Sequence, residues 1–170
     1  RQRQMCIRDR GEYEVYRVEY MGNRYSILLA PGPWSMEMVE IWLPRSVWVK
    51  GRQLAVFTVH ELYDGRLRGP MDGGYYAMRL PVLEHLYSRG RQATVIAVRE
   101  VTPDYYAPVG SWQIRESVRH ALRGKPERFS SLEEALRALF KGIETPAELA
   151  VKEAKLLRLM KGQKKLLEYL

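Results

Sequence analysis

Alternation of apolar and polar side chains predicts strands in the first half of the chain. In residues 12–20, Tyr16, Val18 and Tyr20 recur at every second position, which is the period of a half-buried strand. Residues 24–30 repeat the pattern and predict a strand that returns beside the first. Because so few residues separate the two runs, we expect them to form an antiparallel hairpin.

Glycine and proline mark the turns between the predicted elements. Gly22 followed by Asn23 predicts a type II′ turn, because glycine tolerates positive φ at the first central position. Residues 34–43 predict a short amphipathic helix that Pro44 ends. Residues 53–60 and 92–101 predict two further strands, and the second has the apolar run of a fully buried strand.

The apolar period changes to that of a helix after residue 75. The apolar stripe of this predicted helix consists of Tyr76, Leu80, Leu83 and Tyr87. Pro81 should bend the helix or mark its first turn, since proline lacks the amide that a helix interior needs.

Three more helices are predicted in the last third of the chain. The first covers residues 112–123 and places four apolar residues inward: Ile114, Val118, Ala121 and Leu122. Ser130 and Glu133 predict a capping box for a helix to about residue 140. Thr145, Pro146 and Glu148 predict the start of a helix that runs to about residue 160, after which Gly162 releases the chain.

Strands first and helices last predict an α+β fold, with a small, mostly antiparallel sheet packed with helices. The predicted organisation has three parts: residues 1–10, an α+β domain over residues 11–160, and a free C-terminal peptide over residues 161–170. Residues 1–10 have no periodicity and resemble the translation of a sequencing adaptor, so we exclude them from the fold. An upstream domain is expected to be missing.

Charge and composition exclude several functional classes. Lys plus Arg number 28 against 20 Asp plus Glu, a net charge of +8. Residues 1–10 carry +3 of this charge, and the mildly basic remainder is unlike a protein that coats nucleic acid. Cys6 is the one cysteine and lies in the excluded segment, which leaves no thiol for catalysis, a zinc site or a disulfide. The single asparagine, Asn23, fits a heat-adapted source.

The expected setting is the cytoplasm, in association with the nucleoid. No apolar run is long enough to span a bilayer, and no early apolar segment resembles a signal peptide. His60, His85 and His120 are isolated in the sequence and unlike a ligand set, so we expect neither a metal nor a cofactor.

The last eight residues carry the most specific motif. Gln163, Leu166, Tyr169 and Leu170 fit the pattern Q-x-x-aliphatic-x-x-aromatic-hydrophobic, which is typical of peptides that bind the sliding clamp PCNA. A spacing of three residues places the first three side chains on one face of a 3₁₀ turn. The apolar side chains then enter a clamp pocket while the glutamine amide fixes the register. The alternative is a final amphipathic helix that covers the domain's own core.

The chain also resembles the C-terminal part of the archaeal Nre proteins, which are DNA-repair factors. The resemblance rests on residues 29–34 (LAPGPW), 73–80 (GGYYAMRL), 99–106 (REVTPDYY), 110–116 (GSWQIRE), 131–136 (SLEEAL) and 163–170. It implies a role in DNA repair through PCNA, with no settled catalytic activity and with the family's N-terminal half outside this chain. Leu170 stands where the strongest clamp peptides have a second aromatic residue, which implies weaker binding.

Two groups of residues in the body could carry chemistry. Five acids could serve a nuclease metal or a nucleotide-acting enzyme if they converge: Asp72, Glu84, Glu100, Asp104 and Glu116. Arginines nearby in sequence could instead hold these acids in structural ion pairs. The aromatic residues beside the glycine-proline loops have two alternative interpretations: they form the core of the domain, or they stack on nucleic-acid bases. The candidate nucleic-acid ligands are Arg79, Tyr105, Tyr106, Arg115 and Arg119.

Overall fold

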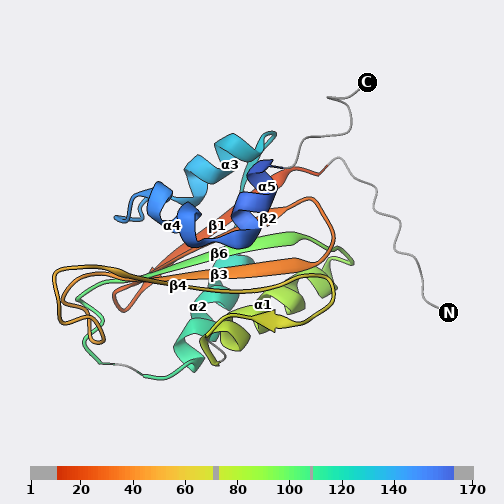
Figure 1. Cartoon of the computed structure of the whole chain (residues 1–170). Coiled ribbons are helices and arrows are strands. Elements are labelled where there is room, and N and C mark those ends of the chain that lie inside the picture. Colours follow the sequence, from red (N-terminus) through yellow and green to blue (C-terminus); the bar gives the residue numbers. More distant parts are fainter. Residues whose placement is uncertain (1–10, 71–72, 108, 163–170) are drawn as a thin grey trace.

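One mixed sheet forms the centre of the protein. The computed structural model describes residues 11–70, 73–107 and 109–162 (Figure 1). The predicted adaptor segment and the clamp motif therefore lie outside the described residues. Within these ranges the strands are β1 (Tyr13–Tyr20), β2 (Asn23–Ala30), β3 (Ser35–Trp42), β4 (Ala55–Glu61), β5 (Leu67–Arg68), β6 (Thr94–Val101) and β7 (Glu127–Phe129).

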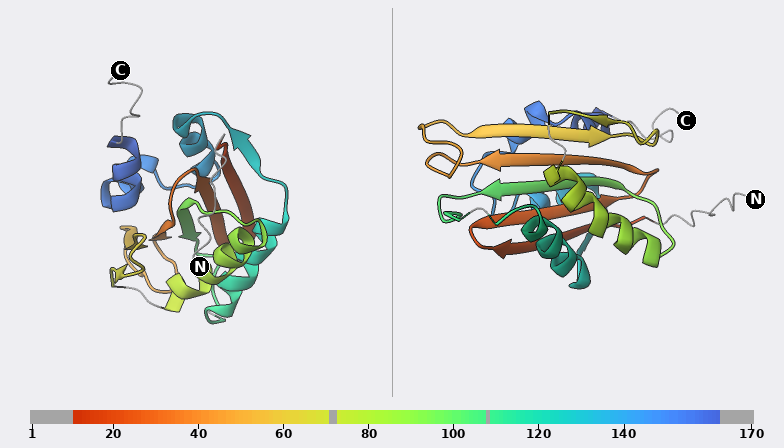
Figure 2. Two further views of the ribbon diagram at one scale, coloured as in Figure 1. Left: turned by 90° about the vertical axis from the view of Figure 1, so that its right-hand side faces the viewer. Right: turned by 90° about the horizontal axis from the view of Figure 1, so that it is seen from below.

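Helices cover both faces of the sheet. They are α1 (Gly73–Ser88), α2 (Trp112–Arg123), α3 (Leu132–Leu139), α4 (Ala147–Glu153) and α5 (Lys155–Gly162). Helices α1 and α2 lie on one face, and α3, α4 and α5 lie on the other (Figures 1 and 2). The strand order is β5-β4-β3-β6-β2-β1-β7, and every described pair is antiparallel except β3 with β6. This arrangement confirms the α+β prediction.

Strand β6 lies at the centre of the sheet and separates two apolar cores. Val95 and Ala97 face the core beneath α1 and α2, whereas Ile96 and Val98 face the core beneath α3, α4 and α5. All eight residues of β6 are buried. A strand that is covered on both faces reads as a continuous apolar run, which is why this strand is so clear in the sequence.

The helix predicted over residues 34–43 is wrong, because this segment is strand β3. Met36 and Met38 face one core while Val39 and Ile41 face the other, as the two-residue period of a strand requires. Two polar positions spaced as on a helix face favoured the helical prediction. Both are glutamates that are buried inside the molecule and paired there with distant partners.

The hairpin turn is shifted by one residue from the prediction. Tyr20 pairs with Asn23, so Met21 and Gly22 are the central residues, with φ of 49° and 67°. Two positive φ angles define a type I′ turn rather than a type II′ turn. A Cβ on Gly22 would lie 2.4 Å from the amide nitrogen of Tyr105, so only glycine fits against that loop.

The apolar stripe predicted for α1 is wrong as well. Its buried face is formed by Tyr75, Met78, Pro81, Val82 and Leu86. Three residues of the predicted stripe, Tyr76, Leu80 and Tyr87, are exposed instead, and Leu83 is half-buried. Both stripes contain aromatic and aliphatic residues, so the sheet decides which one is covered. Helix α1 continues through Pro81, which lies in its interior.

The C-terminal helices match the prediction in part. Helix α2 spans the predicted residues, and its four predicted inward residues are buried. The cap of α3 is shifted by one residue, since the Ser131 side chain accepts the Glu134 amide and also donates to the Glu134 carboxylate. The long final helix is wrong: it breaks at Ala154, where the backbone is extended, into α4 and α5.

Buried acids account for the changes around the final helices. The Glu37 carboxylate accepts the amides of Lys155 (2.8 Å) and Leu157 (3.1 Å), which begins α5 as a separate helix. Thr145 does not cap α4, because its hydroxyl donates to the Glu100 carboxylate, and Pro146 occupies the cap position.

Candidate functional site

Three connecting segments meet at the carboxyl ends of the parallel strands β3 and β6. They are the turn at residues 21–22, the loop at residues 43–54 and the loop at residues 102–111 (Figure 2). In sheets with parallel strands, ligands bind outside the carboxyl ends of those strands. Helices α1 and α2 run side by side from this end, because Gly74 lies near Ile114 and Arg119 pairs with Glu84 further along.

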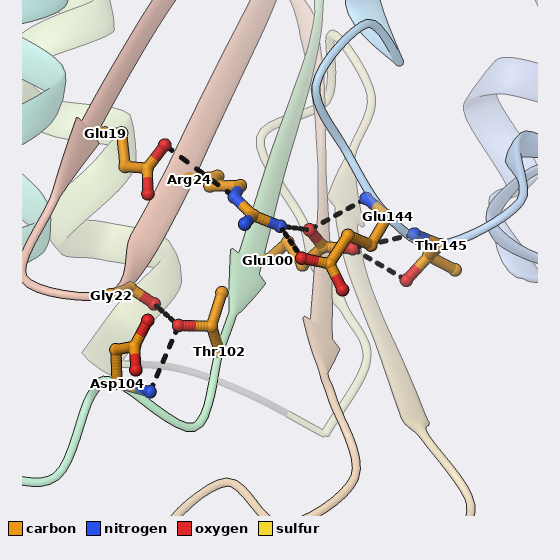
Figure 3. Close-up of polar contacts among 8 residues, drawn as sticks. All are labelled: Glu19, Gly22, Arg24, Glu100, Thr102, Asp104, Glu144 and Thr145. Carbon is orange, nitrogen blue, oxygen red and sulfur yellow. Dashed lines mark hydrogen bonds and ion pairs between the residues drawn. The ribbon is translucent and has the colours of Figure 1, made fainter.

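Hydrogen bonds tie the three segments together. Leu43 donates its amide to the Val101 carbonyl (2.9 Å), and Thr102 donates its amide to the Gly22 carbonyl (2.9 Å). The Thr102 hydroxyl also donates to the Gly22 carbonyl (3.0 Å) and accepts the Asp104 amide (3.3 Å; Figure 3). The site is therefore built on a fixed scaffold.

Arg99 forms the centre of a buried polar network beneath these loops. Its guanidinium donates to the Glu40 carboxylate (2.8 Å) and twice to the Asn23 side-chain oxygen (2.9 and 2.7 Å). It also lies over the rings of Trp42 (5.5 Å) and Tyr105 (5.7 Å). Because Arg99 is 5% exposed and each of its three guanidinium nitrogens donates a hydrogen bond to Glu40 or Asn23, it acts as a brace between strands and loops rather than as a ligand contact.

A second buried network connects the sheet to α2. Tyr25 donates its hydroxyl to the Gln113 side chain (2.8 Å), and Gln113 donates in turn to Ser117 (3.3 Å). Burial raises the pKa of Tyr25 to about 12, so this hydroxyl stays protonated near neutral pH. These bonds fix α2 on the sheet.

Glu100 follows Arg99 in β6, so its side chain lies on the opposite face of the sheet. Figure 3 shows its polar contacts. Its carboxylate accepts Arg24 (2.9 Å), the amides of Glu144 (3.0 Å) and Thr145 (2.9 Å), and the Thr145 hydroxyl (2.8 Å). Arg24 also contacts Glu144 (2.7 Å) and Glu19 (3.7 Å). Glu100 is fully engaged in holding the segment before α4.

The structure separates the four described acids of the five considered for catalysis, with Asp104 in the loop at residues 102–111. Glu84 and Glu116 both pair with Arg119 on the outer surface of α1 and α2, and Arg115 also contacts Glu116. The hydrogen bond from Arg115 lowers the pKa of Glu116. Glu100 lies on the other face of the sheet, and Asp72 lies outside the described residues. Among residues 11–70, 73–107 and 109–162, no group of three or more His, Cys, Asp or Glu could hold a metal ion.

The structure also separates the predicted nucleic-acid ligands. Tyr105 is 4% exposed and accepts the Val109 amide at its hydroxyl (3.2 Å), so the prediction that its ring stacks on a base is wrong. Its neighbour Tyr106 is 86% exposed. Two adjacent tyrosines thus have opposite environments, since the first packs under the loops and the second points away from them.

The three predicted arginines lie in different places. Arg79 donates to Glu61 (2.8 Å) and lies over the Trp34 ring (5.6 Å), near the amino end of β3. Arg119 is bound by Glu84 and Glu116, whereas Arg115 has the more exposed side chain and contacts Glu116. Of the predicted ligands, Tyr106, in the loop at residues 102–111, and Arg115, in the first turn of α2, have side chains that are open to a partner.

The sequence analysis missed the loop at residues 43–54. This loop carries three cations and no acid, together with a tryptophan: Arg45, Trp48, Lys50 and Arg52. All four side chains are exposed, and Trp48 is 70% exposed. The run PRSVWVKGR contains the signal, which is three cations around one tryptophan with no acid.

Comparison with known proteins gives two family matches. Residues 5–49 match a model described as archaeal Nre, N-terminal, and residues 61–169 match one described as archaeal Nre, C-terminal. The N-terminal match corrects the expectation that the family's N-terminal half lies wholly outside the chain. It also begins inside the segment that resembles an adaptor.

Curated relatives support the family assignment. The chain is 43% identical over 128 residues to "DNA repair protein NreA" of Haloferax volcanii, a match that covers 73% of this chain and 30% of that protein. It is 38% identical over 130 residues to "DNA repair protein NreA" of Archaeoglobus fulgidus, covering 76% and 33%. The chain thus spans about a third of the length of these relatives. No solved structure matches the chain significantly. None of the described helices is long and apolar enough to cross a membrane.

The two matched regions meet inside one sheet. Strands β1, β2 and β3 lie in the N-terminal match, and β5, β6 and β7 lie in the C-terminal match, which begins at the last residue of β4. Strand β6 pairs with both β2 and β3, so the two regions interleave in the described structure. The chain belongs to the archaeal Nre family.

Proposed function

We propose that this chain is part of a DNA-repair factor that the sliding clamp PCNA recruits through residues 163–170, while the body contacts DNA or a repair partner. The observation that carries the proposal is the motif formed by Gln163, Leu166, Tyr169 and Leu170, in a chain whose curated relatives are named DNA repair proteins. A clamp peptide needs no catalytic site in the body to direct a protein to DNA.

The described end of the body suits the attachment of such a peptide. Helix α5 ends at Gly162, directly before the motif, and Lys155, Arg158 and Lys161 are exposed on it. With Lys164 and Lys165, the chain has five cations around the start of the motif. Positive charge beside an apolar motif steers a peptide toward an acidic surface or toward DNA.

The geometry favours a binding role over catalysis by the candidate acids. Glu84, Glu100 and Glu116 lie on different elements, and each contacts an arginine. Carboxylates that bind a catalytic metal pair have to converge. In the body, Tyr106 and Arg115 are the sequence-predicted residues best placed to contact DNA.

Calorimetric titration against PCNA tests the clamp peptide. Tyr169→Ala removes a ring that buries about 150–250 Å² and should cost on the order of 2–4 kcal/mol of binding free energy. Gln163→Ala should cost less, because a hydrogen bond contributes less than a buried ring. Glu168→Ala is the matched control, since residue 168 lies off the face that residues 163, 166 and 169 share.

Thermal melts of the same variants separate the two interpretations of the tail. A free peptide predicts an unchanged melting temperature in all three variants. Unchanged clamp affinity together with a lowered melting temperature in Tyr169→Ala would show that the tail covers the domain's own core.

A further inference from the structure

The loop at residues 43–54, which we name the basic loop, combines positive charge with an exposed aromatic ring. Arg45, Lys50 and Arg52 are exposed, and the loop contains no acid. Trp48 lies between these cations and is 70% exposed. A large aromatic side chain is seldom left this open to water unless it serves an interface.

The loop holds Trp48 in a defined position. Ser46 and Val49 form an isolated β-bridge, with the Val49 amide donating to the Ser46 carbonyl (3.0 Å), so Trp48 lies in the tight turn between them. The Ser46 amide donates to the Leu43 carbonyl (3.1 Å), and Arg45 has φ of 66°. Positive φ in a residue other than glycine is strained, and such strain is concentrated at functional segments.

Trp48 differs from Trp34 and Trp42 in its polar contacts. The indole N–H groups of Trp34 and Trp42 donate to Glu61 and Glu40 at 2.7 Å each. Trp48 meets the Trp42 ring edge to face, with centroids 6.5 Å apart, and has no hydrogen-bond partner among the described residues. One edge of Trp48 is therefore supported while much of the ring remains accessible.

A second exposed ring lies on the neighbouring loop. Val49 packs against the buried cluster that contains Trp42 and Tyr105, which joins the basic loop to the loop at residues 102–111. Tyr106 follows directly and is 86% exposed. Two open aromatic rings and a group of unopposed cations thus lie at one end of the sheet.

We propose that this end of the sheet binds single-stranded DNA, with bases stacked on Trp48 and Tyr106 and with Lys50 and Arg52 at the phosphates. The inference rests on the proposed function and deepens it by naming the form of DNA. Aromatic rings stack on bases that are already unpaired, and cations beside the rings follow the backbone.

The distribution of charge favours a single strand over a duplex. A duplex is held mainly by a broad positive surface. On the outer surface of α1 and α2, however, Arg119 is neutralised by Glu84 and Glu116. The basic loop instead carries cations that no described acid opposes directly beside open aromatic rings, which is the combination that a single strand needs.

The position of the basic loop allows DNA and the clamp to bind together. Gly162 lines a groove with Pro33, Ser35 and Thr94, so α5 ends near the amino ends of β3 and β6. The basic loop follows the carboxyl end of β3. Eight residues of strand separate the two ends by about 25 Å, and Figure 1 shows α5 and this loop well apart.

Fluorescence anisotropy with a labelled oligothymidylate about 12 nucleotides long tests the inference. We expect tighter binding of this strand than of a duplex of equal length. Trp48→Ala should weaken binding roughly ten-fold to a hundred-fold, and Trp48→Phe should retain much of the affinity. The double variant Lys50→Gln/Arg52→Gln should flatten the slope of log affinity against log salt by about 1.4.

Matched controls come from the amino ends of β3 and β6 and from the segment after α2. Tyr63→Ala removes another open ring, which is 82% exposed, and Arg91→Gln/Lys125→Gln removes two exposed cations. These controls should leave single-strand affinity within about two-fold. Equal losses in Trp48→Ala and Tyr63→Ala, or tighter binding of the duplex, would overturn the inference.

Titration of the basic-loop variants against PCNA separates this inference from the proposed function. Clamp affinity should be unchanged in Trp48→Ala and in Lys50→Gln/Arg52→Gln. If the chain binds PCNA but does not bind the single strand, the inference about DNA is overturned and the proposed function is not. Weakened clamp binding in the loop variants, without DNA binding, would make the loop a protein contact and also overturn it. If the native chain does not bind PCNA, or if Tyr169→Ala leaves clamp affinity unchanged, the result would count against the proposed function.

Discussion

The two faces of the sheet use buried glutamates in different ways. On the face toward α1 and α2, each of three glutamates pairs with an arginine: Glu14 with Arg89, Glu40 with Arg99, and Glu61 with Arg79. On the face toward α3, α4 and α5, Glu37 and Glu100 hold main-chain amides of the C-terminal segments.

This difference follows from what each face has to position. Side-chain pairs brace the strands and α1: Glu40 and Arg99 lie beneath the candidate site, whereas Glu61 and Arg79 lie near the amino end of β3. Carboxylates that accept amides set where short helices begin, as Glu37 does for α5. Glu40 thus helps to hold the candidate site, and Glu37 helps to position α5 on the opposite face.

The largest expected effect is at Glu40. Glu40→Ala leaves the Arg99 guanidinium buried without its counter-ion, which should cost about 3–5 kcal/mol of unfolding free energy. Glu40→Gln should recover little, because the unpaired charge remains. Urea unfolding of both variants measures the effect, and a glutamine variant as stable as the native chain would remove the distinction between the two faces.

A smaller loss is expected at Glu100. Glu100→Ala leaves the amides of Glu144 and Thr145 without an acceptor and should cost about 2–3 kcal/mol. Arg24 keeps Glu144 and Glu19 as partners. Glu100→Gln should recover part of the loss, since an amide oxygen also accepts an N–H, and the same unfolding measurement tests this. Equal losses in the alanine and glutamine variants would contradict the role assigned to this face.

The smallest effect is a difference in pH dependence between Glu14 and Glu37. The hydrogen bond from Arg89 lowers the pKa of Glu14 below 4.5, so its stabilising effect is present above that pH and is lost as the pH falls through the folded value. Burial raises the pKa of Glu37 above 4.5, so ionisation of its carboxylate lowers stability as the pH rises through the folded value.

Stability measurements of glutamine variants from about pH 7 to about pH 2 reveal these opposite signs, because the folded pKa of Glu14 lies below 4.5. On acidification, the stability advantage of the native chain over Glu14→Gln should shrink, while its stability relative to Glu37→Gln should rise. His60 lies 4.0 Å from Glu37, and burial lowers the pKa of His60, so His60 stays neutral over the upper part of this range. Slopes of the same sign for both variants would refute the comparison.

Elements with a strong local period could be predicted from the sequence. Strands β1, β2, β4 and β6 and helix α2 lie close to their predicted positions, because their apolar spacing is unambiguous within each segment. Strand β7 has three residues and carries too little pattern to detect. Its pairing with β1 forms in the folded sheet.

Errors arose where a distant partner decides the environment of a residue. In β3, Glu37 and Glu40 have helical spacing, but their partners lie far along the chain, in α5 and at Arg99. The same holds for the break at Ala154, since Glu37 begins the next helix. The candidate site shows the effect again, because Tyr105 is buried while Trp48 is exposed.

The sequence by itself determined the α+β class, the long strands, α2 and the motif at residues 163–170, because each is encoded in neighbouring residues. The tertiary structure decided which face of α1 is buried, where α4 ends, and which aromatic rings remain open. Burial and the pairing of buried charges depend on segments that meet only in three dimensions, such as β6 between β2 and β3. Local periodicity cannot supply that information, since a buried glutamate and an exposed one look the same in the sequence.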